Sequence, residues 1–110
     1  MKYQIIFSKN ARDDLLSSIK YIREKLLSPG SADKLSQRIL SEIKTLDEMP
    51  MRYPLCENKD WKSLGLRVLP IDHYLVFYLP DEVKKLVKIY RIIYSGRDID
   101  NQLKENIVFE

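Results

Sequence analysis

The sequence predicts one α+β domain in which a small antiparallel sheet packs against a two-helix hairpin. Three observations predict this class. Two stretches with apolar residues at helical spacing come early, three runs of strand-forming residues come late, and Pro and Gly separate them. The predicted order is β-α-α-β-β-β. A chain of 110 residues suffices for one hydrophobic core, so a single domain is expected over residues 1–110.

The first strand and helix are predicted from the N-terminal sequence. Residues 2–7 (KYQIIF) have the composition of a short strand. Ser8 follows and offers a side-chain oxygen to the free amides at the start of a helix. In that helix, apolar residues recur every three or four positions, which predicts one face turned toward the core. This stripe comprises Ala11, Leu15, Ile19, Ile22 and Leu26.

A second helix is predicted directly after a break at residues 28–30. Ser28 is a candidate N-cap, and Pro29 suits the first helical position because no amide donor is needed there. The helix is expected to end before Pro50. Both helices have an apolar stripe, so both are expected to pack on a sheet. The second stripe comprises Ala32, Leu35, Ile39, Ile43 and Leu46.

Three strands are predicted in the second half of the chain. The middle one (HYLVFYL) is almost entirely apolar or aromatic, as expected for a strand that is covered on both faces. Alternation places Tyr74 and Tyr78 on one face of this strand, and Tyr90 and Tyr94 on one face of the last strand. The three predicted strands span residues 66–71, 73–79 and 86–94.

Two segments lie outside these elements. Residues 50–63 contain two prolines and alternating charges, so they are expected to form a loop, with Trp61 near its end. Trp61 is interpreted either as a binding anchor or as a lid on the edge of the sheet. Residues 99–110 are expected to form either a short helix or a loose tail.

The charge distribution narrows the class of partner. Residues 51–97 carry nine Lys or Arg against five Asp or Glu, whereas residues 98–110 carry one against four. The basic middle permits contact with an acidic partner or a phosphate backbone. The single cysteine, Cys56, suits a reducing cytosol. No apolar run approaches the roughly 18 residues of a membrane span, so a cytoplasmic protein without a membrane partner is predicted.

Five short motifs follow one another along the second half of the chain: Tyr53-Pro54, residues 64–69 (LGLRVL), 74–78 (YLVFY) and 89–93 (IYRII), and Gly96-Arg97-Asp98. With the predicted order of elements, these motifs resemble the RelE/ParE superfamily of toxins. The resemblance implies the toxin of a bacterial type II toxin–antitoxin pair, which arrests growth unless its antitoxin binds it. It also implies a disordered, acidic antitoxin segment that folds on the toxin, and a complex that binds operator DNA through the antitoxin.

The resemblance leaves the target open between two machines. RelE-like members cut messenger RNA in the ribosome, whereas ParE-like members inhibit DNA gyrase and have no cleavage chemistry. Leu75 stands where RelE-like members have an arginine, Arg97 matches a second arginine, and Tyr94 is only a displaced candidate for a C-terminal tyrosine. Gyrase inhibition is therefore favoured. The alternatives are a ribosome-dependent mRNA endoribonuclease and an inactive member that only binds antitoxin and co-represses its operon.

The candidate site residues follow from these alternatives. RNA cleavage by the 2′-hydroxyl needs a base, an acid and cations, for which Arg67, Arg97 and Tyr94 are the candidates. Arg67 is otherwise a solvated arginine paired with a carboxylate, and Arg97 a turn residue paired with Asp98. His73 has no titrating partner at a recognisable spacing and is interpreted as structural, and no cofactor or metal is expected. The candidates for target or nucleic-acid binding are Lys59, Trp61, Lys62, Arg67 and Arg97.

Overall fold

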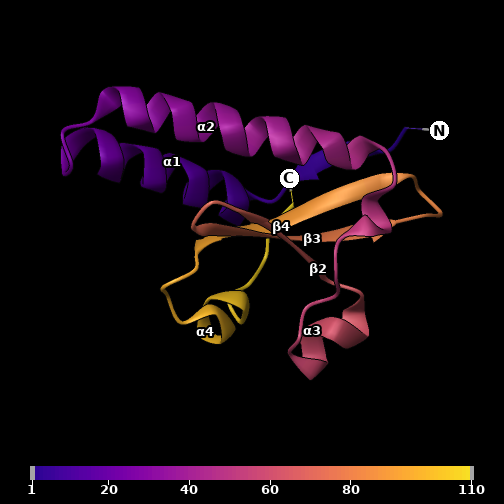
Figure 1. Cartoon of the computed structure of the whole chain (residues 1–110). Helices are drawn as coiled ribbons and strands as arrows, with labels where there is room; N and C mark the ends of the chain where they lie inside the picture. Colours follow the sequence, from indigo (N-terminus) through magenta and orange to yellow (C-terminus); the bar gives the residue numbers. More distant parts are fainter. Residues whose placement is uncertain (1, 110) are drawn as a thin grey trace.

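The computed structural model describes residues 2–109, in which a four-stranded sheet lies between two helical layers (Figure 1). Helices α1 and α2 form a hairpin over one face, and α3 and α4 lie on the other. The predicted α+β class is confirmed. No helix in the described range is long and apolar enough to cross a membrane. The elements are β1 (Gln4–Phe7), α1 (Lys9–Glu24), α2 (Pro29–Lys44), η1 (Thr45–Asp47), η2 (Pro50–Arg52), α3 (Lys59–Leu64), β2 (Arg67–Ile71), β3 (Tyr74–Asp81), β4 (Leu86–Tyr94) and α4 (Ile99–Leu103).

The sheet has the strand order β1-β4-β3-β2. Strands β2, β3 and β4 form the predicted antiparallel meander. Strand β1 differs from the prediction because it joins β4 in parallel, which makes the sheet mixed. Parallel neighbours need a long connection, and the helical hairpin and the meander together supply it.

A β-bulge interrupts the pairing of β3 with β4. The consecutive residues Phe77 and Tyr78 pair with Arg91 and Ile89, which leaves Tyr90 as an extra residue in β4. An extra residue breaks the alternation of side chains along a strand. The alternation of β4 side chains between the two faces of the sheet is therefore shifted by one residue at the bulge.

The bulge overturns one prediction about the tyrosines. Tyr74 and Tyr78 both pack against the α1–α2 face, as expected. Tyr90 instead packs in the cluster on the α3–α4 face, whereas Tyr94 contacts the ring of Tyr74 at the α1–α2 face. The prediction that Tyr90 and Tyr94 share one face is therefore wrong, because the extra residue lies between them.

The larger hydrophobic cluster lies between the sheet and the α1–α2 hairpin. The stripe of α2 is buried or half-buried throughout, as predicted, and so is the first part of the α1 stripe. Leu26 is the exception. Helix α1 ends at Glu24, so Leu26 lies beyond it and is 58% exposed. The buried members of this cluster are Ala11, Leu15, Ile39, Ile43, Leu46, Leu69, Ile71, Val76, Tyr78, Val87, Ile89 and Ile92.

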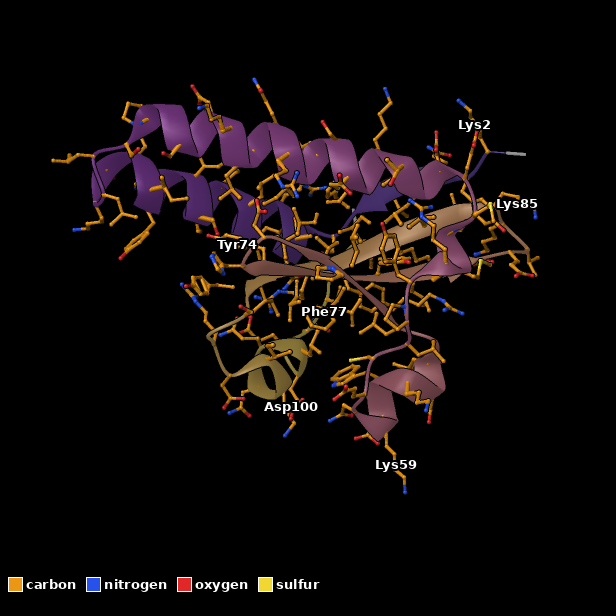
Figure 2. The ribbon with its side chains drawn as sticks, viewed as in Figure 1. Lys2, Lys59, Tyr74, Phe77, Lys85 and Asp100 are labelled. Atoms are coloured by element: carbon orange, nitrogen blue, oxygen red, sulfur yellow. The ribbon has the colours of Figure 1, made fainter. Side chains whose placement is uncertain are left out.

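A smaller cluster covers the other face of the sheet. Phe77 points from the sheet toward the space between α3 and α4 (Figure 2). Its neighbours include Leu66 and Leu103, which is 2% exposed. Residues 99–110 were expected to form either a short helix or a loose tail, and the structure shows a short helix, α4, that packs on the sheet.

Helix α3 replaces part of the predicted loop. Asn58 caps it by accepting a hydrogen bond from the amide of Asp60 at 3.0 Å. Gly65 ends it in the left-handed region, at φ 88°. Asn58 and Gly65 are common residues at helix ends, so the sequence does carry signals for this short helix. The alternating charges between them favour a loop instead, which is why the helix was not predicted.

The two long helices begin in different ways. The hydroxyl of Ser8 accepts a hydrogen bond from the amide of Ala11 at 2.9 Å, which confirms the predicted cap of α1. Ser28 occupies the predicted position before α2, but its side chain makes no capping bond. Its hydroxyl donates to the hydroxyl of Ser31 at 2.7 Å instead.

Candidate functional site

A cleft of about 1290 Å³ opens between α1 and the end of β4. Helix α1 forms one wall, the turn between β2 and β3 another, and the segment that follows β4 the third. The cleft contains two of the predicted site residues, Tyr94 and Arg97. The lining residues are Asp14, Ser17, Ser18, Tyr21, Ile22, Leu26, Leu35, Asp72, His73, Tyr74, Arg91, Ile92, Ile93, Tyr94, Gly96, Arg97, Gln102 and Glu105.

Arg91 lines this cleft and is 4% exposed. Its Nε donates to Oδ2 of Asp14 at 2.7 Å, and its Nη2 donates to Oδ1 of Asp14 at 2.8 Å. This bidentate geometry is the strongest form of arginine–carboxylate pairing. The hydrogen bonds to Asp14 raise the pKa of Arg91 above its usual value, so the guanidinium stays charged.

Arg91 also fastens α4 and the residues that follow it. Its Nη1 donates to the carbonyl oxygen of Gln102 at 2.7 Å and lies 3.3 Å from Oε2 of Glu105. Its Nη2 also donates to Oε1 of Gln102 at 3.0 Å. One guanidinium therefore holds α1, β4 and the C-terminal segment together beside the cleft.

Side chains from the start of α1 cover part of the edge of β4. The hydroxyl of Ser8 donates to the carbonyl oxygen of Tyr90 at 2.6 Å. Oδ2 of Asp14 accepts a hydrogen bond from the amide of Ile92 at 2.9 Å. Strand β1 pairs with β4 only as far as Ile89, so the rest of this β4 edge has no neighbouring strand. The two side chains bind backbone groups of that edge in place of a strand.

Three aromatic rings meet at the far end of the cleft. The rings of His73 and Tyr94 are roughly parallel, with centroids 6.4 Å apart. Tyr74 meets Tyr94 edge-on at 5.6 Å. Gly96 lies against the Tyr94 ring, since a Cβ at that position would stand 3.2 Å from it. The turn after β4 therefore positions the Tyr94 ring, which remains 46% exposed.

Arg97 lies in the cleft with an exposed side chain. Asp98 does not pair with it, because its carboxylate caps α4 and accepts from the amide of Asn101 at 3.4 Å. Among residues 2–109, the Arg97 guanidinium has no hydrogen bond or ion pair. Arg97 is therefore available to a binding partner.

Arg67 lies outside this cleft and is already engaged. Its Nη1 donates to the carbonyl oxygens of Met51 and Tyr53, at 3.0 and 2.7 Å. Backbone carbonyls thus take the place of the carboxylate that the sequence suggested. The structure gives Arg67 the role of fixing the segment around η2 against the sheet.

The three remaining candidates lie together on α3, and none of them lines the cleft. Lys59 extends from α3 away from the sheet (Figure 2). Lys62 is also exposed. Trp61 is half-buried and packs against the smaller cluster. This position agrees with the interpretation of Trp61 as a lid on the sheet. The predicted set is therefore divided between the cleft, the η2 segment and α3.

Two further residues bear on catalysis. Leu75 is half-buried, pairs with Ile93 and packs in the smaller cluster, so this position is apolar. Cys56 is buried, and burial raises the pKa of its thiol, so it remains protonated at neutral pH. Within the described residues, no group of three or more His, Cys, Asp or Glu side chains could hold a metal ion.

Comparison with known proteins identifies the family. The model of the family described as "ParE toxin of type II toxin-antitoxin system, parDE" matches residues 5–99. The chain belongs to this toxin family. A search of curated protein sequences finds no significant match.

Two solved structures show the fold of the family. One is a chain of "Chromosomal ParDE TA system from P. aeruginosa", 20% identical with a TM-score of 0.69, and the alignment covers 84% of this chain and 96% of that one. The other is a chain of the RelBE2 toxin–antitoxin complex from Mycobacterium tuberculosis, 20% identical with a TM-score of 0.58, covering 86% and 99%. At this identity the likeness concerns the fold alone.

In this ParE-family toxin, sequence reasoning missed Asp14, Arg91 and His73 as parts of the cleft. Asp14 and Arg91 are 77 positions apart, so no local pattern connects them. A signal for Arg91 did exist, because it is a charged residue within an apolar strand. Such a residue needs a partner when it is buried.

Proposed function

We propose that this toxin arrests growth by binding DNA gyrase and that an antitoxin holds it inactive. The observation that carries the choice of gyrase is the dispersal of the cations that RNA cleavage requires. A ribonuclease brings a base, an acid and cations to one phosphate. Here Arg67 is bonded to carbonyls, and Lys59 and Lys62 lie on α3, outside the cleft that contains Arg97.

The position of Leu75 supports the same choice. RelE-like toxins place an arginine there, next to the tyrosine of the central strand. In this chain the position contributes to an apolar cluster with Phe77 and Leu103. A cation introduced there would have to displace apolar contacts, so the site is built for packing rather than for phosphate binding.

The charges of the cleft also disfavour RNA. Three carboxylates line it, from Asp14, Asp72 and Glu105, against the two guanidiniums of Arg91 and Arg97. A phosphate backbone is attracted by a clear excess of cations. The lining has no such excess, so we expect it to attract RNA only weakly. A protein surface that combines apolar and charged groups is a better match for the cleft.

An antitoxin partner is supported by the family itself, whose members are toxins of type II toxin–antitoxin systems. The titles of the two similar structures name a ParDE system and a RelBE2 complex. We expect the complex to bind operator DNA through the antitoxin. Because gyrase acts on chromosomal DNA in the bacterial cytoplasm, we expect the toxin to act there.

One observation favours the second candidate, ribosome-dependent RNA cleavage. Tyr94, Arg97 and His73 line the same cleft, and the His73 and Tyr94 rings lie 6.4 Å apart. A histidine, a phenol and a free guanidinium are groups that can transfer protons and stabilise a charged phosphate. On that alternative, these three residues would do the chemistry without Arg67.

Induced expression in a sensitive bacterium tests the proposal. Growth, messenger 5′ ends and plasmid supercoiling are followed in one culture, with co-expression of the antitoxin as the control that restores growth. Arrest with gyrase-linked DNA breaks and intact messages is the expected result. Codon-positioned cuts in messages would establish the ribonuclease instead. Normal growth would leave only an inactive member that binds antitoxin.

A further inference from the structure

We infer that the tip of the α1–α2 hairpin contacts gyrase directly and places the side chain of Leu27 in an apolar pocket of that enzyme. The hairpin tip is defined as residues 25–30, where α1 has ended and α2 begins. The inference rests on the gyrase inhibition proposed above, and it adds the part of the toxin that makes the contact. It concerns the protein subunits of gyrase rather than the DNA that gyrase holds.

The hairpin tip projects beyond the sheet (Figure 1). It carries two neighbouring leucines, Leu26 and Leu27, which are 58% and 81% exposed. Neither leucine belongs to a hydrophobic cluster of the described chain. An ion pair between Arg23 and Asp33, 2.7 Å apart, joins the two helices beside the tip. The tip is therefore held in place while its apolar side chains remain in solvent.

Leu27 also has a strained backbone. Its φ of 51° lies in the left-handed region, where Cβ comes close to the following carbonyl oxygen. Glycine is the usual residue in that conformation after a helix, because it has no Cβ. Within residues 2–109, the Leu27 backbone makes no hydrogen bond. The fold of the free toxin therefore does not require a leucine here, and a strained residue without a structural cause points to binding.

Met49 provides a comparison because it shares both features. Its φ is 50°, and it is 76% exposed. Its conformation has a structural cause, since Nη1 of Arg52 donates to the carbonyl oxygens of Glu48 and Met49 at 2.7 and 3.3 Å. No side chain holds the Leu27 backbone in this way. Met49 is therefore a matched control for the effect of backbone strain alone.

The charges around the hairpin tip favour an acidic protein surface. Residues 23–34 carry the three cations Arg23, Lys25 and Lys34 against the two carboxylates Glu24 and Asp33. Asp33 is bound by Arg23, and within residues 2–109 neither lysine has a carboxylate partner. An exposed leucine beside two free lysines fits an apolar pocket with an acidic rim. An excess of one cation attracts a phosphate backbone only weakly, so the expected contact is protein rather than DNA.

The hairpin tip adjoins the cleft for which a protein partner is proposed above. Leu26 and Tyr21 line that cleft, whereas Leu27 does not. A protein bound in the cleft along α1 therefore reaches the tip over the apolar surface of Leu26 and Tyr21. Substitution of Leu27 changes the tip and leaves the lining of the cleft intact.

Two variants of Leu27 separate the side chain from the backbone. Leu27→Gly relieves the left-handed strain and removes the side chain, whereas Leu27→Asn keeps a similar size and suits the left-handed region. Both are expected to melt at the wild-type temperature or above it. Both should also need at least about tenfold more toxin for half-inhibition of supercoiling by gyrase. Met49→Gly relieves the same kind of strain and is expected to inhibit gyrase as the wild type does.

Binding to the gyrase holoenzyme without DNA, and binding to the antitoxin, complete the test. The Leu27 variants are expected to lose affinity for gyrase by the same factor and to keep the wild-type affinity for the antitoxin. If antitoxin affinity falls and gyrase inhibition does not, the tip belongs to the antitoxin contact and the inference is wrong.

Three further results would overturn the role of Leu27 while the wild-type toxin still inhibits gyrase. They are wild-type inhibition by both Leu27 variants, a lower melting temperature of Leu27→Gly, and an equal loss of inhibition in Met49→Gly. A loss of affinity confined to DNA-bound gyrase would replace the protein pocket with a DNA contact. Failure of the wild-type toxin to inhibit gyrase would overturn the proposed function together with this inference.

Discussion

Arg91 and Asp14 illustrate how single residues organise this molecule. The Arg91 guanidinium lies at the edge of the sheet and bonds to α1 and to the C-terminal segment. Removing one member of a buried pair leaves the other charge without compensation, which costs more than the pair itself contributes. The same residue lines the cleft, so a contact that stabilises the fold lies within the candidate site.

Arg91→Met is therefore expected to lower the free energy of unfolding by about 3 kcal/mol. The matched control is Arg97→Met, which removes an exposed and unpaired guanidinium a few positions away and is expected to change stability by about 0.5 kcal/mol or less. Urea unfolding at pH 7 measures both. Equal losses for the two variants would show that the Asp14 pair does not stabilise the fold.

Tyr78 provides a pH-dependent test at the same scale. Burial raises its pKa to about 12, from an ordinary value of 10.0, and its hydroxyl donates to the carbonyl of Pro50 at 2.6 Å. Above pH 10 the unfolded chain loses this proton while the folded chain retains it, so stability falls as pH rises from about 10 to about 12.

Tyr78→Phe is expected to lose about 1–2 kcal/mol at pH 7, because the Pro50 carbonyl loses its donor. Its stability should then fall less steeply than that of the wild type between about pH 10 and pH 12. A smaller slope remains, since burial also raises the pKa of Tyr90. Chemical denaturation across this pH range measures the difference, and parallel curves for the two proteins would refute the assignment to Tyr78.

At the scale of elements, the sequence predicted best what depends on local patterns. The last strand has its predicted bounds of 86–94, because its apolar composition and the polar break after it are both local. The bulge at Tyr90 and the parallel pairing of β1 were not predictable, because both depend on which strands meet. Helix α3 was expected to be part of a loop because its composition is charged, although Asn58 and Gly65 mark its ends.

The two helix starts give an element-scale prediction. Ser8 is fully buried, caps α1 and also donates to the Tyr90 carbonyl, whereas the Ser28 side chain makes no capping bond. Ser8→Ala is expected to cost about 2 kcal/mol, since a cap and a buried hydrogen bond are lost together. Ser28→Ala is expected to cost about 0.5 kcal/mol or less. Thermal unfolding of both variants compares them, and similar melting temperatures would contradict this account of Ser8.

At the scale of the whole molecule, the sequence predicted the fold class and the family but only half of the cleft. The sequence predicts Tyr94 and Arg97 because they lie at and just after the end of the last strand, where the resemblance places functional residues. Asp14 and His73 join them only when α1 and the β2–β3 turn fold against that strand. The motif around Arg67 predicts it as a site residue, but its hydrogen bonds to two carbonyls depend on the path of the chain around η2.

The central claim concerns the target, and purified gyrase tests it most directly. Supercoiling of relaxed plasmid by gyrase is measured with increasing amounts of the toxin, with and without its antitoxin. The account predicts that the toxin alone inhibits supercoiling and that the antitoxin restores it. Unimpaired supercoiling at toxin concentrations that cut ribosome-bound messenger RNA would contradict the account and make this family member a ribonuclease.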